Sequence, residues 1–277
     1  MIVVADSGST KCDWIFKSDA ETKRVSTMGF NPMFHSTEFI VQELQKHEAF
    51  KNVTGVSHVY FYGAGCSSDR LKKIVVDALV QIFGSAEILV QHDLTGAVYA
   101  ACQGQPGIAC ILGTGSNSAV FDGDKIHEEV PALGYILGDE GSGSYFGKQL
   151  LSRYLYKQLP DHIRQKFEEY YPNLDKDKVF SKTYMEPNAN VYLASYMKFL
   201  SDNRDDKYIQ EMVYHGLSSF IDIHIWQYKG YKNLPVHFVG SIAYFFEEVL
   251  RKAANNHRLQ VGRIIRRPVD YLLEYHS

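Results

Sequence analysis

A run of small polar residues near the start of the chain, Asp6-Ser7-Gly8-Ser9-Thr10-Lys11, strongly limits what the chain can fold into. The apolar residues 1–5 are typical of a buried strand, and residues 12–16 alternate apolar side chains on one face, which predicts a second strand. The run is therefore expected to be a tight hairpin, with Asp6 at the end of a buried strand. Small residues let backbone N–H groups approach a bound anion, and a carboxylate beside such a turn suits a Mg²⁺–phosphate complex. An ordinary hairpin fits the same residues, so the run alone leaves the function open.

The composition is that of a typical globular protein. The 277 residues can form one large domain or two of ordinary size, and 45% of them are hydrophobic and 22% charged. A net charge of -3 gives no reason to expect nucleic acid or an anionic membrane as a partner. Four scattered cysteines without a CxxC pair argue against structural zinc and favour reduced thiols in a cytoplasmic protein. The apolar run at residues 2–5 has no basic flank, so no signal peptide is expected, and no apolar stretch approaches the ~20 residues that span a bilayer.

Strand and helix patterns alternate in the first part of the chain. Strands are expected over residues 2–5, 12–16, 23–30, 58–62 and 86–90, and helices over residues 36–47, over residues 71–82 and from Leu94 onward. Ser36 is a typical helix N-cap, and Gly84 is a typical helix end. Residues 103–107 are rich in glycine, glutamine and proline, which is the composition of a domain boundary.

The order of strand, glycine turn and strand then occurs a second time. Strands are expected over residues 108–112, 118–121, 125–130, 236–239 and 258–261, with a polar turn over residues 113–117. Residues 141–229 are mostly helical in pattern, one helix is expected from Gly240-Ser241 to Ala253, and a short helix is expected over residues 269–275. The arginines near the end of the chain are interpreted as solvated surface residues: Arg263, Arg266 and Arg267.

Four short motifs follow one another along nearly the whole chain. They are Asp6-Ser7-Gly8-Ser9-Thr10-Lys11, Leu112-Gly113-Thr114-Gly115-Ser116-Asn117, Gly134-Tyr135-Ile136-Leu137-Gly138-Asp139-Glu140-Gly141-Ser142 and Phe238-Val239-Gly240-Ser241-Ile242-Ala243. In this order they resemble the two phosphate loops, the GDEGS sugar-side motif and the adenosine loop of a known kinase and ATPase family. This family comprises the N-acetylglucosamine kinases and the related BadF/BadG/BcrA/BcrD ATPases, within the actin/hexokinase/Hsp70 ATPase superfamily. The P-loop motif GxxxxGK[ST] and the dinucleotide motif GxGxxG are both absent.

The resemblance implies an α/β fold with two actin-like ATPase (ribonuclease H-like) domains flanking a cleft, each a mixed five-stranded sheet with helices. The expected N-terminal domain spans residues 1–105, and the expected C-terminal domain spans residues 106–277. As in relatives, the last helix, residues 268–277, is expected to fold back onto the N-terminal domain.

The resemblance also implies ATP and Mg²⁺ as cofactors. Asp6 would hold the metal ion directly or through water, and the other nucleotide-binding residues would be Gly8, Ser9, Thr10, Lys11, Gly113, Thr114, Gly115, Gly240, Ser241 and Ala243. Alternatives stay open for several of them. Asp6 can cap the turn, Lys11 can be a solvated hairpin lysine, and Ser241 can simply start a helix.

The implied substrate is a small amino sugar. The residues that match sugar-binding loops are Asn31, Gly63, Ala64, Gly65, Thr114, Asn117 and Asp139. Asn31 precedes a proline and can equally be a turn residue. Asp93 follows a buried strand, at the sheet edge where α/β proteins bind ligands, and by resemblance it is the base that takes a proton from a sugar hydroxyl. The alternative role for Asp93 is the N-cap of the following helix.

The sequence is therefore interpreted as an ATP-dependent sugar kinase that transfers the γ-phosphate to a hydroxyl of N-acetylglucosamine or glucosamine. Leu133 stands where the animal enzymes carry an aromatic residue, so the exact sugar stays open, and a muramic acid derivative is an alternative. A nucleotide-binding regulator or sensor of the BadF type, without sugar kinase turnover, is the alternative from another class. The partners implied are the sugar and ATP, with no nucleic acid and no membrane, and a homodimer is left open.

Overall fold

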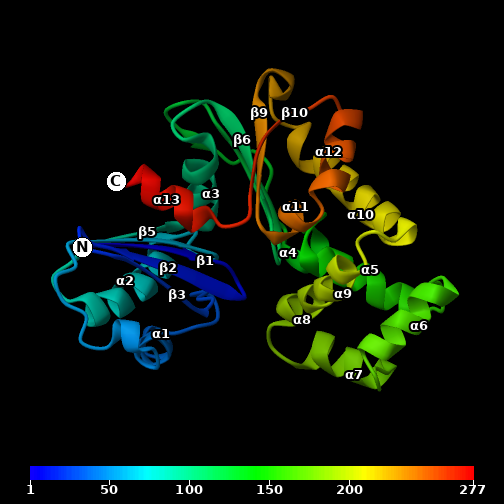
Figure 1. The fold of residues 1–277 in the computed structure, drawn as a ribbon, viewed down its shortest axis with the longest axis horizontal. Coiled ribbons are helices and arrows are strands. Elements are labelled where there is room, and N and C mark those ends of the chain that lie inside the picture. Colours follow the sequence, from blue (N-terminus) through cyan, green and yellow to red (C-terminus); the bar gives the residue numbers. More distant parts are fainter. The chain divides into compact units, whose positions relative to one another are not determined.

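The computed structural model describes residues 1–277, which divide into two compact units. The first unit is Met1–Gln105 together with Arg267–Ser277, and the second unit is Pro106–Arg266. Each unit contains a five-stranded sheet with helices packed against it (Figure 1). None of the helices is both long and apolar enough to cross a bilayer.

The sheet of the first unit is mixed. Its strands are β1 (Ile2–Ser7), β2 (Lys11–Lys17), β3 (Thr22–Met28), β4 (His58–Gly63) and β5 (Glu87–His92). They are arranged in the order β3-β2-β1-β4-β5. β2 pairs antiparallel with both β1 and β3, whereas β4 pairs parallel with both β1 and β5. The hairpin β1–β2 therefore ends at the same sheet edge as the parallel strands β4 and β5.

Helices cover both faces of this sheet (Figure 1). They are α1 (Thr37–Gln45), α2 (Asp69–Phe83), α3 (Asp93–Cys102) and α13 (Pro268–Tyr275), with a short 3₁₀ turn at Glu48–Phe50. Alternate residues of a strand point to opposite faces, so β1 supplies two cores. Val3 and Ala5 join the core that includes residues of α1 and α2, whereas Val4 joins the core with Ala100 of α3 and residues of α13.

The last helix is held to the first unit by aromatic contacts. The ring of Tyr60 stacks on His276 at 3.6 Å between centroids, and the Tyr62 hydroxyl lies 2.7 Å from His276 Nε2. Tyr99 of α3 stacks on Tyr275 at 4.5 Å between centroids. These contacts explain why the last residues of the chain belong to the first unit although β10 before them belongs to the second.

The sheet of the second unit repeats the pattern of the first. Its strands are β6 (Gly107–Leu112), β7 (Ser116–Phe121), β8 (Ile126–His127), β9 (Pro235–Val239) and β10 (Gln260–Ile265). They are arranged in the order β10-β9-β6-β7-β8, with β6–β7 and β7–β8 antiparallel and β6–β9 and β9–β10 parallel. The predicted fold class, two mixed five-stranded sheets with helices, is confirmed.

The second unit contains most of the helices. They are α4 (Gly134–Leu137), α5 (Gly143–Leu155), α6 (Asp161–Tyr170), α7 (Lys176–Phe180), α8 (Ala189–Ser195), α9 (Met197–Asp202), α10 (Lys207–Phe220), α11 (Ser241–Phe245) and α12 (Glu247–Asn256). Five-residue π-helical turns follow α7 (Ser181–Met185) and α10 (Ile221–Ile225), and a 3₁₀ turn spans Tyr231–Asn233. One large apolar core joins these helices to β6 and β9.

Three sequence predictions about the second half of the chain are wrong in detail. The single helix expected from Ser241 to Ala253 is broken at Phe246, whose φ of -115° and ψ of 31° are not helical and whose ring is buried in the core. The strand expected over residues 125–130 is reduced to Ile126–His127, as is common for a strand at a sheet edge. The last strand begins and ends later than expected, at Gln260–Ile265.

A buried histidine, His237, lies in the centre of the second sheet. Its Nδ1 accepts a hydrogen bond of 2.9 Å from the backbone N–H of Arg263 in the neighbouring strand. Glycines on both sides leave room for the ring, since a Cβ at Gly262 would lie only 2.5 Å from His237 Nδ1. Burial, aided by the charge of Arg263, lowers the pKa of His237 to about 4. The folded protein therefore keeps this ring neutral.

This pKa predicts a pH-dependent loss of stability. Between pH 6.5, the ordinary pKa of histidine, and about pH 4, the unfolded chain binds a proton at His237 that the folded chain does not. The free energy of unfolding should therefore fall as the pH is lowered through this window, by about 2–3 kcal/mol from this group at pH 4. Urea unfolding at pH 7, 5 and 4 should show a smaller fall for His237→Asn than for the unmodified protein. The exposed His215→Asn variant is the control, and equal pH dependence of His237→Asn and the unmodified protein would contradict the assignment.

Candidate functional site

The hairpin between β1 and β2 presents bare backbone at its tip. The Gly8 N–H donates to the Lys11 carbonyl at 2.9 Å, which closes the turn, and Ser9 and Thr10 occupy the tip. A Cβ added at Gly8 would meet no other atom nearer than the Lys11 carbonyl oxygen at 3.8 Å. Packing within the unit therefore does not require glycine at this position, although the Gly8 N–H is used within the turn and its carbonyl oxygen lies against Gly29.

Asp6 lies at the base of this hairpin, with two other carboxylates close to it. The register of β1 and β2 pairs Asp6 with Asp13, and Asp93 lies near enough for its charge to act on Asp6. Burial, and then the charges of Asp93 and Asp13, raise the pKa of Asp6 to about 7, although Lys11 opposes them. The first unit thus concentrates negative charge at the end of the buried strand β1.

Asp13 was not singled out by the sequence reasoning. It accepts hydrogen bonds from the Ser26 hydroxyl at 2.6 Å and from Lys11 Nζ at 2.7 Å, and Arg267 Nε lies 3.7 Å from its Oδ2. Burial works against ionisation of Asp13, but these partners outweigh it and lower its pKa. The available signal was the hairpin itself, because antiparallel pairing across a tight turn places residue 13 opposite residue 6.

Two expectations about basic residues change with this finding. Arg267 was expected to be a solvated surface residue, and its side chain is indeed 40% exposed, but it also pairs with Asp13 because the chain passes beside β2 before it enters α13. Lys11 is also paired with Asp13, although its side chain remains 56% exposed. A phosphate contact by Lys11 remains a prediction.

Asp93 is the first residue of α3, directly after β5. The N-cap position belongs to His92, so the carboxylate of Asp93 is not the cap that the alternative interpretation required. Its Oδ1 accepts the Leu94 N–H at 2.9 Å and lies 3.2 Å from His92 Nε2. The side chain is 23% exposed, so part of the carboxylate remains accessible.

The predicted sugar loops of the first unit contact one another and β1. The Ala64 N–H donates to the Ser7 carbonyl at 2.8 Å. Gly65 has a φ of 78°, and a Cβ there would lie 2.1 Å from Asn31 Oδ1, so only glycine allows this approach. Asn31 Oδ1 also accepts the Met33 N–H at 2.9 Å, which gives Asn31 the turn role that the sequence left open. The structure thus gathers Asp6, Asn31, Gly63 to Gly65 and Asp93 in one unit.

The second glycine turn lies between β6 and β7. The Gly113 N–H donates to the Gly115 carbonyl at 3.0 Å, and the first amides of α5 hold the turn, since Gly143 N–H donates to the Gly113 carbonyl at 2.8 Å. The Ser144 N–H donates to the Thr114 carbonyl at 3.0 Å. A Cβ at Gly113 would meet no atom nearer than 3.9 Å, so the side-chain position of this glycine, like that of Gly8, is open, whereas its N–H and carbonyl are bonded within the unit.

Asp139 forms a hydrogen bond to the backbone of this second turn. It has a φ of 59°, which is uncommon for a residue other than glycine, and its Oδ1 accepts the Ser116 N–H at 3.2 Å. The Ser144 hydroxyl lies 3.4 Å from Oδ2, and burial raises the pKa of Asp139 despite these bonds. The side chain of Asn117, the residue after Ser116, also forms two hydrogen bonds. Its Nδ2 donates to Glu128 Oε1 at 3.2 Å, and its Oδ1 accepts the Ser118 N–H at 2.8 Å. Both side chains support the loop from within the unit.

The predicted adenosine loop lies against the second turn. Gly240 has a φ of 122°, and a Cβ there would lie 2.4 Å from the Leu112 carbonyl oxygen, so this position requires glycine. Ser241 is the first residue of α11, and Ala243 is buried in it. The structure therefore brings Gly240, Ser241 and Ala243 next to Gly113 within the second unit.

A buried histidine behind the GDEGS motif was also missed. His224 Nε2 lies 3.8 Å from Glu140 Oε2, its Nδ1 lies 3.5 Å from the Ser118 hydroxyl, and its ring stacks on Phe220. Burial lowers the pKa of His224 although Glu140 opposes it. Nothing in the sequence links His224, in the π-helical turn after α10, to Glu140.

Comparisons with known proteins identify the family of the chain. No protein-family model matches the chain, and no curated protein matches it. The structure of a presumed N-acetylglucosamine kinase from Porphyromonas gingivalis is 33% identical in sequence and aligns with a TM-score of 0.91, covering 100% of this chain and 98% of that one.

Two more distant structures share the fold. A presumed N-acetylglucosamine kinase from Chromobacterium violaceum is 17% identical with a TM-score of 0.72, covering 100% of this chain and 98% of that one. A ROK family glucokinase from Streptomyces griseus, in complex with glucose and AMPPNP, is 12% identical with a TM-score of 0.53, covering 96% of this chain and 93% of that one.

The first of these relatives is similar enough, over the whole length of both chains, to decide the family. The order of the four motifs and the two matching sheets agree with it. The chain belongs to the N-acetylglucosamine kinase-like family of carbohydrate kinases, within the actin/hexokinase/Hsp70 ATPase superfamily.

Proposed function

We propose that the chain is an ATP-dependent kinase that transfers the γ-phosphate of ATP to a hydroxyl of an amino sugar, with N-acetylglucosamine and glucosamine as the first candidates. The observation that carries the proposal is the grouping of Asp6 and Asp93 beside the open glycine hairpin of the first unit. The relative from Porphyromonas gingivalis, which bears the name of an N-acetylglucosamine kinase, supports the choice of sugar.

Each of the two glycine turns is proposed to contact phosphates of ATP. At Gly8 and Gly113 a side chain would point into free space, yet both positions have none. A position without a side chain lets a phosphate approach a turn closely. The Gly8 and Gly113 N–H groups are bonded within their turns, so other groups of the turns would donate to the phosphates. The loop Gly240 to Ala243 contacts the second turn, and by family resemblance it takes the adenosine.

Asp6 is the residue that would hold Mg²⁺. No group of three or more histidine, cysteine, aspartate or glutamate side chains could enclose a metal ion, so a site made of protein ligands alone is not available. Mg²⁺ usually binds one or two carboxylates and fills its shell with phosphate oxygens and waters, which one carboxylate at a phosphate hairpin fits. When bound, Mg²⁺ neutralises charge on the phosphates. The raised pKa of Asp6 supports this role, because the protein itself supplies too little positive charge there.

Asp93 is proposed as the base. The sugar hydroxyl oxygen would form its bond to the γ-phosphorus while the bond to ADP breaks, and the hydroxyl proton would pass to the Asp93 carboxylate. The transition state of phosphoryl transfer is loose, so the proton leaves late and a strongly raised pKa is not needed. The accessible part of the Asp93 side chain, at the carboxyl end of β5, suits a group that must reach a substrate.

The remaining predicted sugar residues have two kinds of role in this proposal. Gly63, Ala64 and Gly65 would offer backbone groups, since they are held in place by Ser7 and Asn31. Asn117 and Asp139 already hold the second turn, so their free lone pairs and amide hydrogens would contact sugar hydroxyls without large movement.

A panel of sugars tests the proposed function. ADP release should be stimulated by N-acetylglucosamine or glucosamine more than by glucose or N-acetylmuramic acid, at saturating ATP and Mg²⁺. Preference for N-acetylmuramic acid would change the substrate but keep the enzyme class. Binding of ATP without stimulation by any sugar of the panel would instead indicate a nucleotide-binding regulator.

Replacing Asp93 by asparagine tests the base. The variant keeps the shape of the side chain but loses the proton acceptor, so kcat should fall by ~10²–10⁴-fold, with the KM values for sugar and ATP changed much less. The matched control is Asp69→Asn, because Asp69 is likewise the first residue of a helix, is exposed and lies at no predicted site. Steady-state kinetics and melting temperatures of both variants test whether Asp93 is the base. Near-normal kcat in a well-folded Asp93→Asn protein would remove Asp93 from the chemistry.

Replacing Asp6 by asparagine tests the metal role. The Mg²⁺ concentration for half-maximal turnover should rise by about tenfold or more, since a contact with a charged group is typically worth ~1.5–3 kcal/mol, while sugar binding should stay nearly unchanged. The pKa of Asp6 is raised to about 7 from the ordinary 3.8, so its ionised form destabilises the folded state as the pH rises through this range. The ligand-free variant should therefore melt at a higher temperature than the unmodified protein at pH 8. Unchanged Mg²⁺ dependence would exclude Asp6 from the metal site.

A further inference from the structure

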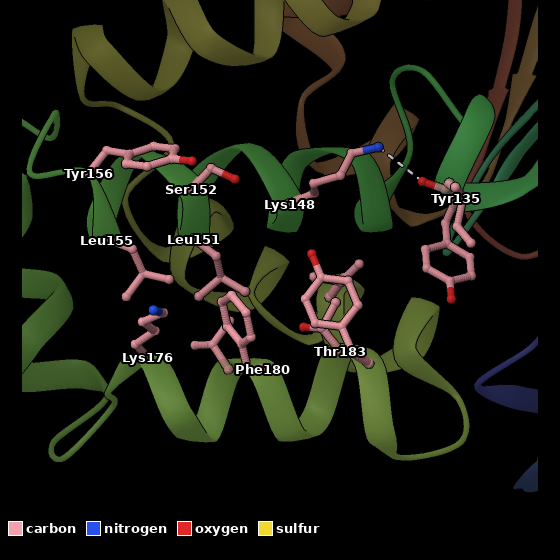
Figure 2. A pocket seen from close by; sticks show the side chains of 13 residues that line it. Tyr135, Lys148, Leu151, Ser152, Leu155, Tyr156, Lys176, Phe180 and Thr183 are labelled. Atoms are coloured by element: carbon pink, nitrogen blue, oxygen red, sulfur yellow. Dashed lines mark hydrogen bonds between the residues drawn. The ribbon is translucent and has the colours of Figure 1, made fainter.

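The start of the GDEGS motif is held by little apolar packing. α4, Gly134–Leu137, contains no buried residue, and Leu133, Ile136 and Leu137 are exposed. A cavity of about 630 Å³ lies beside it, lined by Tyr135 and Ile136 together with residues of α5 and α7 (Figure 2). Most of the stability of a short helix in a protein comes from the apolar face that it buries. The position of this segment therefore depends on polar contacts.

The motif is linked to the surrounding helices at both ends. At its start, Lys148 Nζ of α5 donates to the Tyr135 carbonyl at 3.0 Å (Figure 2). Near its other end, Glu140 Oε2 lies 3.8 Å from His224 Nε2, in the π-helical turn Ile221–Ile225 that follows α10. Such turns occur often at functional sites. The proposed mechanism gives no role to this histidine.

His224 connects two segments through its two ring nitrogens. The ring is buried, and burial lowers its pKa, so it is neutral at pH 7 and has one donor and one acceptor nitrogen. Nδ1 lies 3.5 Å from the Ser118 hydroxyl, which lies 2.9 Å from the Tyr228 hydroxyl. A carboxylate attracts a donor, so the proton is assigned to Nε2, which faces Glu140, and Nδ1 accepts from Ser118.

Each of these two segments carries a predicted sugar residue. Ser118 follows Asn117 in β7, and Glu140 follows Asp139 in the motif. Alternate residues of a strand point to opposite faces, so the Asn117 side chain lies on the face opposite Ser118. The link through His224 therefore holds the strand and the motif together without using the Asn117 amide or the Asp139 carboxylate.

We propose that His224 is a positioning residue of the sugar side, which sets the separation of the segments that carry Asn117 and Asp139 so that both meet the hydroxyls of one sugar. His224 is buried, and its effect passes through Glu140 and Ser118. The inference rests on the proposed function, because that function makes Asn117 and Asp139 sugar residues.

Replacing His224 by leucine tests the link. In steady-state kinetics with the sugar that stimulates ADP release most, His224→Leu should raise the KM for the sugar by about tenfold, and the KM for ATP by less, because Glu140 and Ser118 lose a buried partner. His224→Gln keeps a donor near the position of Nε2 and should restore most of the sugar affinity. The matched control is His237→Leu, since His237 is also buried in the second unit but bonds to β10. This control should lower the melting temperature and leave the sugar KM unchanged.

Three results would each overturn the inference. They are equal rises of the two KM values in His224→Leu, a sugar KM that His237→Leu raises as much, and no recovery of sugar affinity in a folded His224→Gln protein.

Glu140→Ala provides a result even where His224→Leu does not fold, because the Glu140 side chain is 19% exposed and water can replace the carboxylate. It should raise the sugar KM by a similar factor. The double variant His224→Leu/Glu140→Ala should raise it no further, since both changes break one link. An unchanged sugar KM in a folded Glu140→Ala protein, or a product of the two single effects in the double variant, would contradict the positioning role.

The unmodified protein separates this inference from the proposed function. If no sugar stimulates its ADP release, the proposed function fails and the inference fails with it. Sugar-stimulated turnover with an unchanged sugar KM in a folded His224→Leu protein overturns the inference alone.

Discussion

The burial of the Asp6 carboxylate close to Asp13 and Asp93 is the constraint on which the proposed chemistry of the first unit depends. Strand pairing fixes Asp6 opposite Asp13, and the end of β5 fixes Asp93 near Asp6, so the backbone rather than the side chains brings these charges together. Asp13 remains ionised because Lys11, Ser26 and Arg267 surround it. Burial of Asp6, and then the charges of Asp93 and Asp13, raise its pKa to about 7. Ionisation of Asp6 therefore lowers the stability of the folded chain, and in the proposed function a cation carried by a phosphate ligand would offset this cost.

The two units have the same sheet order but use glycine differently. At the first and second turns, Gly8 and Gly113 have free space where a side chain would be. At Gly240 the space is filled by the Leu112 carbonyl, so glycine there permits two loops of the second unit to touch. Open space alone is weak evidence for a ligand, because Gly84 and Gly230 also have it and need glycine for their positive φ. A glycine that neither packing nor a positive φ requires is better evidence. By this criterion the two turns are stronger ligand candidates than the predicted adenosine loop.

What the sequence predicted well depended on local pattern. Ser36 caps α1 as expected, Asp6 lies near the end of a buried strand, and the repeat of strand, turn and strand indicated two similar halves. The fold class itself came from the resemblance of the four motifs to a known family. What it missed depended on contacts between distant segments. The pairing of Arg267 was missed because its partner Asp13 is at the other end of the chain, and His224 could not be linked to Glu140. The helix break at Phe246 was also hidden, since the apolar spacing continues through it and only burial of the ring in the core explains the turn.

The contrast between Asp6 and Asp93 bears on how one unit could use two aspartates for two proposed tasks, metal binding and proton acceptance. A metal-binding carboxylate benefits from surplus negative charge, because the excess is relieved only when a cation arrives. A base in a loose phosphoryl transfer needs access and position more than a shifted pKa. The pKa of Asp6 is raised to about 7 by burial and by the charges of Asp93 and Asp13, whereas Asp93 begins a helix with part of its side chain accessible. Backbone position therefore separates the two proposed roles: Asp6 lies within a central strand, and Asp93 lies where an outer strand has already ended.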